Sequence, residues 1–196
     1  AERHTQYAAR KYKATSATTI VMEPESGEIL ALYNYPDYDL NNFGDYEPSV
    51  RRNLAVTDIF EPGSSFKFVT AAAAIEEGRV KPEDRFFCEK GRYRIGGRLL
   101  HDYKPYGELS FKEIMEHSSN IGIVKVAQLL GERTLYKYIK DFGFGSLTRI
   151  DLAGEVKGIV RAWLDTSIIA YLDLASTISC NKDCKVSARG VVFTAG

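Results

Sequence analysis

Disulfides, net charge and long apolar runs are scarce in this 196-residue sequence. Three cysteines, an odd number, exclude a dense disulfide framework. The 26 basic and 26 acidic residues cancel, so we expect no nucleic-acid partner, because such binding depends on many phosphate contacts. No apolar run is long enough to span a bilayer. No signal peptide is present either, so any targeting segment of an exported protein is expected to have been removed.

The cysteines and histidines do not follow a metal-binding pattern. Cys180 and Cys184 are four positions apart and could pair or bind a metal, but no histidine lies near them. The histidines are scattered at His4, His101 and His117. Because free cysteine is usually buried, we interpret the cysteines as structural thiols, and we interpret His117 as a surface or packing residue.

The apolar fraction of 44% is enough to form a sizeable core in one domain. Strand-like segments with turn formers between them are predicted at 17–22, 28–33, 86–88 and 92–95. Helical spacing of apolar residues predicts helices over 1–14, 64–77, 111–117, 121–130 and 134–142. We expect an α/β or α+β domain in which a helical cluster packs on a sheet.

Cap and turn residues mark the ends of two predicted helices. Gly78 follows the helix 64–77 at the place where a C-terminal glycine belongs. Ser110, with Glu113 three positions later, predicts a capping box at the start of the helix 111–117. Residues 34–60, rich in Asn, Asp, Tyr and Pro and without a clear period, predict an ordered loop.

A serine and a lysine stand at the head of the helix 64–77. Ser64 and Lys67, three positions apart after the turn at 61–63, are predicted to share one helix face. A serine hydroxyl needs a base to become a nucleophile. A lysine is protonated at its ordinary pKa of about 10.4, but burial and the positive end of a helix lower that pKa. Alone the motif is weak, and the alternative is a capping serine followed by a solvated lysine.

A second polar motif, Ser118-Ser119-Asn120, lies 54 positions (118 − 64) after Ser64. A second serine hydroxyl can relay a proton between Lys67 and a leaving group. An asparagine amide both donates and accepts, so it can hold a substrate amide and the lysine together. The alternative is a polar turn between two helices.

The two motifs together resemble the Ser-x-x-Lys and Ser-x-Asn signature of penicillin-binding proteins. The chain is similar over roughly residues 5–161 to the transpeptidase domain of class B penicillin-binding proteins. Besides the two motifs, the segments that carry this resemblance are 23–31, 52–67, 91–97 followed by His101-Asp102, 142–145 and 150–155.

The resemblance implies the fold shared by penicillin-binding proteins and serine β-lactamases, a helical cluster packed on an antiparallel sheet. It implies that Ser64 is the acylated nucleophile and Lys67 its base, with Ser118 and Asn120 as catalytic and substrate-binding residues of the second motif. The implied reaction is attack on the penultimate D-Ala of a peptidoglycan stem peptide, loss of the terminal D-Ala, and transfer to an amine of a neighbouring stem. β-Lactams would acylate the same serine, and no metal or cofactor is implied.

The resemblance also implies a place in the cell and a set of partners. The expected location is the bacterial cell envelope, as the extracytoplasmic, periplasmic domain of a protein anchored in the inner membrane, with the anchor absent from this chain. Membrane proteins of cell-wall synthesis, which serve cell division or cell shape, are the expected protein partners.

The third motif of the family, Lys-Thr/Ser-Gly on a strand, is not found, and the chain ends 76 positions (196 − 120) after Asn120. We therefore expect a transpeptidase-like domain over 1–161, with residues 162–196 as a divergent or altered C-terminal segment of the same domain, in a fold that is truncated. Losing one oxyanion donor costs about 10²–10³ in rate, so a non-catalytic scaffold fragment stays an alternative. A β-lactamase or β-lactam sensor is another, although the Glu-x-x-Leu-Asn stretch of the hydrolases is missing after the second motif.

Overall fold

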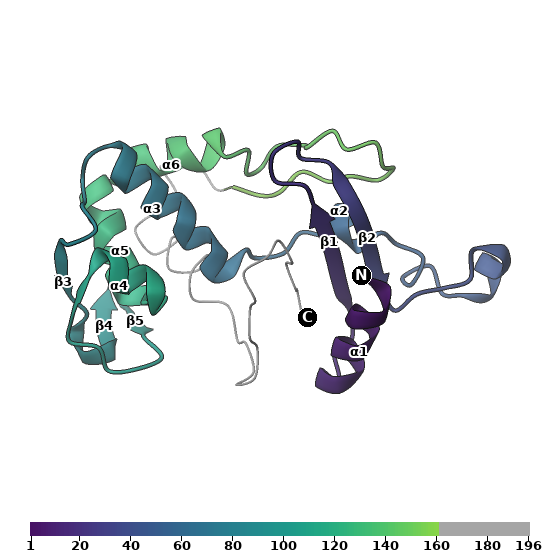
Figure 1. The fold of residues 1–196 in the computed structure, drawn as a ribbon, viewed down its shortest axis with the longest axis horizontal. Helices are drawn as coiled ribbons and strands as arrows, with labels where there is room; N and C mark the ends of the chain where they lie inside the picture. Colours follow the sequence, from purple (N-terminus) through teal and green to yellow (C-terminus); the bar gives the residue numbers. More distant parts are fainter. Residues whose placement is uncertain (161–196) are drawn as a thin grey trace. The chain divides into compact units, whose positions relative to one another are not determined.

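A computed structural model describes residues 1–160, which form two compact units (Figure 1). The N-terminal unit comprises residues 1–60 and 149–156, and the helical unit comprises residues 61–148 and 157–160. The expectations for the segment 162–196, including Cys180 and Cys184, lie outside the described residues. The boundary predicted at residue 161 therefore stays a prediction.

The N-terminal unit is a helix packed on a two-stranded antiparallel hairpin. Its elements in chain order are α1 (Glu2–Tyr12), β1 (Ala17–Met22), β2 (Ile29–Tyr35), the 3-10 helix η1 (Leu40–Asp45) and α2 (Leu54–Thr57). The hydroxyls of Thr5 on α1 and Thr19 on β1 are buried and lie 2.6 Å apart, so they join the helix to the hairpin. The predicted first helix and hairpin are confirmed, whereas the predicted loop 34–60 contains the two short helices η1 and α2.

The helical unit contains the predicted catalytic motifs. Its elements in chain order are η2 (Gly63–Phe66), α3 (Lys67–Glu76), β3 (Arg85–Phe87), η3 (Glu89–Gly91), β4 (Arg92–Ile95), β5 (Arg98–His101), β6 (Glu108–Ser110), α4 (Phe111–Glu116), α5 (Asn120–Leu130) and α6 (Glu132–Asp141). The predicted helices are confirmed to within a few residues. The strands β3 and β4 are confirmed to within one residue, whereas β5 and β6 were not predicted.

Both predicted helix caps are confirmed. Gly78 has a φ of +61°, and its N–H donates to the carbonyl of Ile75, which ends α3 in a left-handed turn. Ser110 accepts from the backbone N–H of Glu113 at 3.2 Å, and the Glu113 carboxylate accepts from the Ser110 N–H at 2.7 Å. This capping box satisfies backbone donors that the first turn of α4 leaves unpaired.

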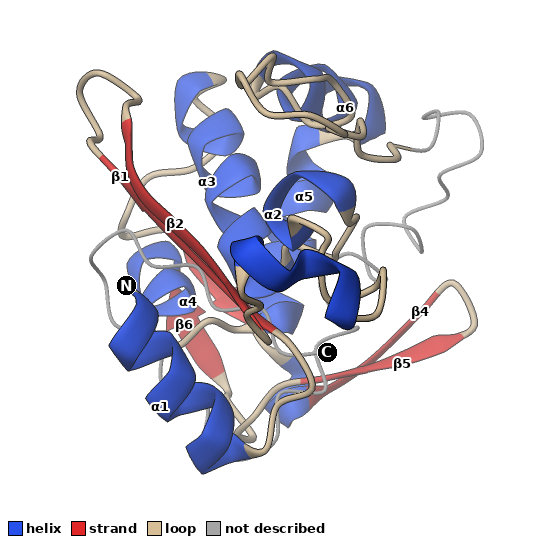
Figure 2. Cartoon of the chain, turned by 90° about the vertical axis from the view of Figure 1, so that its right-hand side faces the viewer, coloured by secondary structure: helices blue, strands red, loops and turns tan. Residues whose placement is uncertain are grey.

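The mixed fold of helices and antiparallel strands is confirmed, but the strands within residues 1–160 do not form one continuous sheet. They pair as β1–β2, β3–β6 and β4–β5, all antiparallel. Figure 2 shows the hairpins β1–β2 and β4–β5. In the helical unit, α5 contacts β3 and β5 and packs against α3, α4 and α6. Fully buried side chains such as Ile114 on α4 and Ile121 on α5 form its core, so α5 is the central element that positions the second motif.

Candidate active site

Ser64 and Lys67 lie at the start of the long helix in the helical unit. Ser64 is exposed in the 3-10 turn η2, and α3 continues from Lys67. Lys67 is only 3% exposed, so its side chain enters the interior. The alternative of a solvated lysine is therefore wrong.

The buried ammonium of Lys67 binds the second motif. Its Nζ donates to the carbonyl oxygen of Ser118 at 2.5 Å, to Ser118 Oγ at 2.9 Å and to Asn120 Oδ1 at 2.6 Å. These contacts bring together three of the four predicted site residues, although 51 and 53 positions separate them along the chain. The second motif is therefore more than a polar turn between helices.

Ser64 is the one predicted site residue that this network does not include. Within residues 1–160, no hydrogen bond joins Ser64 Oγ to Lys67 Nζ. A charged lysine has three N–H groups, and those of Lys67 point to the second motif. Spacing on the helix predicts that Ser64 and Lys67 are neighbours, but it does not identify the acceptors that compete for the amine.

Burial lowers the pKa of Lys67 from its ordinary value of 10.5 to about 8, while the negative charge of Asp102 acts in the opposite direction. The cause is desolvation, because an ammonium loses its hydration in the protein interior. With a pKa near 8, a useful fraction of Lys67 is neutral at physiological pH. A neutral amine can accept a proton, so the structure supplies the property that a base requires.

The second motif adopts a constrained backbone between α4 and α5. Ser118 has a φ of +53°, a left-handed conformation that is uncommon outside glycine. In this conformation both its carbonyl and its hydroxyl contact Lys67. Ser119 is fully buried and caps α5, accepting from the N–H of Gly122 at 2.9 Å.

Asp102 is a site residue that the sequence did not single out by its chemistry. Its carboxylate accepts from Ser119 Oγ at 2.7 Å and from the backbone N–H groups of Asn120 at 2.5 Å and Ile121 at 3.1 Å. The Asn120 side chain also donates to the carbonyl of His101 at 2.9 Å. No local spacing links residue 102 to residue 119, so only the family resemblance, which includes His101-Asp102, could have indicated this position.

Cys88 and His117 have the structural surroundings that were predicted for them. Cys88 is a free, fully buried thiol, and burial raises its pKa, which keeps it in the unreactive protonated form. The His117 ring stacks on Tyr106 with centroids 5.2 Å apart. Residues 1–160 contain no group of three or more His, Cys, Asp or Glu side chains placed to hold a metal ion.

A small cavity beside the stem of Lys67 has a volume of about 20 Å³ and is bordered by Gly63, Phe66 and Thr70 among others. Ligand sites usually measure about 300–1,000 Å³, so this cavity cannot admit a substrate. Ser64, by contrast, is exposed at the surface. None of the helices in residues 1–160 is both long and apolar enough to cross a bilayer.

Comparison with known sequences identifies similar proteins over most of the chain. The family model of the penicillin binding protein transpeptidase domain matches residues 17–178, a range that extends past residue 161. Stage V sporulation protein D of Bacillus subtilis is 41% identical over 162 residues, which are 81% of this chain and 25% of that protein. The probable peptidoglycan D,D-transpeptidase PenA of Neisseria flavescens is 38% identical over 152 residues, 78% of this chain and 38% of the relative. The chain therefore spans between a quarter and two fifths of the length of these relatives.

Solved structures of similar fold include two from Burkholderia. A structure described as a peptidoglycan glycosyltransferase from Burkholderia ambifaria superposes with a TM-score of 0.75 at 28% identity, covering 86% of this chain and 49% of the other. The transpeptidase domain of Burkholderia pseudomallei penicillin-binding protein 3 gives a TM-score of 0.74 at 27% identity, covering 86% and 46%. The chain is therefore similar to penicillin-binding protein domains in its fold as well as in its sequence.

Proposed function

Because the chain belongs to the class B penicillin-binding protein transpeptidase family, we propose that it carries the acylation site of a peptidoglycan D,D-transpeptidase. In this proposal Ser64 is the nucleophile, Lys67 is its base, and Ser118 and Asn120 complete the site. The observation that carries the proposal is the buried Lys67, whose pKa is lowered to about 8 and whose Nζ contacts both Ser118 and Asn120.

Proton accounting explains how Lys67 could serve Ser64. A protonated Lys67 donates all three N–H groups to Ser118 and Asn120. The neutral amine has two N–H groups and one lone pair, so one contact is released and the lone pair can accept the proton of Ser64 Oγ. The oxygen of Ser64 then attacks the carbonyl carbon of the penultimate D-Ala.

The tetrahedral adduct would collapse by breaking the peptide bond to the terminal D-Ala. The leaving amine takes a proton from Lys67, relayed by the Ser118 hydroxyl 2.9 Å away. An ester remains on Ser64. An amine of a neighbouring stem then attacks the ester carbonyl and loses a proton to the site, and Ser64 Oγ is protonated again as it leaves. Asn120 holds Lys67 through its oxygen during these steps.

Substrate, inhibitor and location follow from the same proposal. The donor and acceptor are peptidoglycan stem peptides, and a β-lactam acylates Ser64 in place of the donor. The site would face the extracytoplasmic side of the cell envelope, in the periplasm and tied to the membrane by another part of the protein. Membrane proteins of cell-wall synthesis and division are the proposed partners.

Covalent labelling with a fluorescent penicillin tests the proposal on the full 196-residue chain. We expect a stable label that Ser64→Ala abolishes, because Ser64 is the proposed point of acylation and the Ser118 hydroxyl is bonded to Lys67. Ser65→Ala is the matched control, since Ser65 is an exposed neighbour whose hydroxyl bonds to the Pro62 carbonyl instead. Lys67→Met, which retains most of the buried stem, should also abolish labelling.

The other outcomes of the labelling experiment would each point to a different function or residue role. A label that forms and is rapidly lost indicates a β-lactamase. Absence of label on a folded chain favours the non-catalytic scaffold. Full labelling of Lys67→Met contradicts the assignment of Lys67 as the base.

A further inference from the structure

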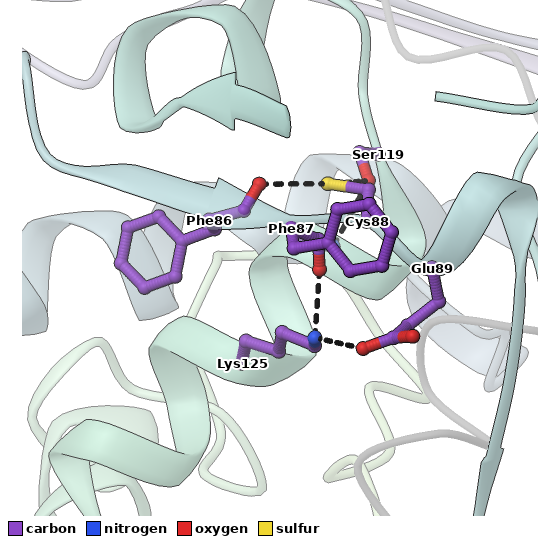
Figure 3. A network of polar contacts seen from close by, with 7 residues as sticks. Phe86, Phe87, Cys88, Glu89, Ser119 and Lys125 are labelled. Carbon is purple, nitrogen blue, oxygen red and sulfur yellow. Dashed lines mark hydrogen bonds and ion pairs between the residues drawn. The ribbon is translucent and has the colours of Figure 1, made fainter. Parts of the chain in front are cut away.

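The side chain of Lys125 on α5 binds residues 87–89 and so links that segment to the helix (Figure 3). Its Nζ donates to the Phe87 carbonyl at 2.7 Å and to the Glu89 carboxylate at 2.5 Å. The ammonium also lies 5.0 Å from the ring centroid of Tyr93. The side chains of Lys125 and Glu89 are 20% and 33% exposed, so this ion pair is more shielded than ordinary surface pairs.

The segment that Lys125 holds has an unusual backbone. Glu89, Lys90 and Gly91 all have a positive φ, at 52°, 50° and 79°. Non-glycine residues rarely adopt this conformation, and they keep it only where surrounding contacts enforce it. At Gly91 a side chain has no room, because an added Cβ would lie 2.8 Å from the Lys104 carbonyl oxygen. The two hydrogen bonds from Lys125 supply such enforcement at the start of this turn.

Both ends of the segment 88–91 contact the groups that support the second motif. At one end, the Cys88 sulfur lies 3.6 Å from the hydroxyl of Ser119 (Figure 3). At the other end, the Gly91 carbonyl accepts from the backbone N–H of Asp102 at 3.1 Å. Asp102 in turn binds Ser119 and the first backbone N–H groups of α5. A displacement of this segment would therefore reach the second motif by two routes.

We propose that Lys125 is a positioning residue: together with Glu89 it holds the segment 88–91 against α5, and thereby holds Ser118 and Asn120 at Lys67. This inference rests on the proposed function. Lys125 acts through Cys88, Asp102 and Ser119.

The test compares four variants of the full chain. Lys125→Met removes the charge but keeps the stem, Glu89→Gln removes the partner charge, and Lys125→Arg keeps a cation that can still bond. Lys137→Met is the matched control, because Lys137 also pairs with a carboxylate at 2.6 Å but on the exposed surface of α6. The readouts are the rate constant of Ser64 acylation by fluorescent penicillin, its pH midpoint, and amide hydrogen exchange at Asn120 and Ile121.

We expect Lys125→Met and Glu89→Gln to slow acylation about tenfold, since a small misplacement of catalytic groups can cost up to 10²-fold. Their pH midpoint should also shift, because it reports the contacts of Lys67, and amide exchange at Asn120 and Ile121 should accelerate. Lys125→Arg should recover most of the rate, and Lys137→Met should behave as wild type. If Lys125→Met does not fold, Glu89→Gln carries the test.

Wild-type rate, pH midpoint and amide exchange in both charge-removing variants would overturn the proposal. A slower rate that Lys137→Met reproduces would also overturn it, since the effect would then be a general loss of stability. If the wild-type chain is not acylated at all, the proposed function fails. Amide exchange at Asn120 and Ile121 then decides on Lys125 alone.

Discussion

The pH dependence of Ser64 acylation is the sharpest consequence of the buried Lys67. Only the neutral amine can act as a base, so the rate should follow the neutral fraction of Lys67. With a pKa of about 8, roughly one lysine in eleven is neutral at pH 7. With the ordinary value of 10.5, the fraction would be about 1 in 3,000. Burial therefore raises the concentration of competent base by roughly 300-fold at neutral pH.

The shape of the profile separates the two cases. The acylation rate constant should rise about tenfold for each pH unit well below 8 and only about 1.8-fold between pH 8 and 9. A solvated lysine would give a rise of about tenfold over that same interval. The assay is the initial rate of fluorescent penicillin labelling, measured from about pH 6 to 9.5 on protein whose folding is checked at each pH.

Asp102→Asn tests what sets the pH midpoint of the acylation rate. The charge of Asp102 raises the pKa of Lys67 against the larger effect of burial. Removing that charge should lower the pKa of Lys67, so the midpoint moves to lower pH. The maximum rate should fall as well, because the carboxylate no longer holds Ser119 and the N–H of Asn120 in the same way. A rate that keeps rising tenfold per unit through pH 9 in wild type, or a midpoint that moves to higher pH in Asp102→Asn, would refute the reasoning.

Two further predictions concern the support of the second motif. Gly122→Ala should lower the free energy of unfolding by about 1–3 kcal/mol in urea denaturation, because its Cβ would lie 2.5 Å from a carbon of the fully buried Ile114 side chain. An unchanged urea midpoint would show that α4 and α5 can separate freely at this contact. Ser110→Ala should lower the unfolding free energy by about 1 kcal/mol through loss of the capping box with Glu113 and accelerate amide exchange in the first turn of α4; unchanged exchange there would contradict the role of the cap.

Local patterns along the chain predicted much of the secondary structure. The apolar spacing of α5, the capping box at Ser110 and the glycine after α3 each depend on residues within one or two turns of each other. Such interactions are encoded in neighbouring positions, so the sequence pattern alone indicates them. The short strand β6 was missed because its pairing partner β3 lies far back along the chain and its own three residues carry no period. The strand β5 pairs with β4 directly across Gly96-Gly97, so that glycine pair was a local hairpin signal that the prediction overlooked.

The candidate active site also combines features that neighbouring residues encode with features that depend on distant contacts. Ser64 and Lys67 are neighbours on one helix, so their spacing was enough to indicate them. The position of Lys67 against Ser118 and Asn120, and the support from Asp102, arise from the packing of α3 and β5 around α5.

The sequence by itself determined the residue types of the proposed chemistry: a hydroxyl, an amine one turn away, and a second polar motif. Tertiary structure alone decided that the amine is buried, that its pKa falls to about 8, and that its N–H groups contact the second motif. The physical reason is that burial and long-range hydrogen bonds depend on which surfaces meet when the chain folds. No stretch of neighbouring residues specifies that meeting.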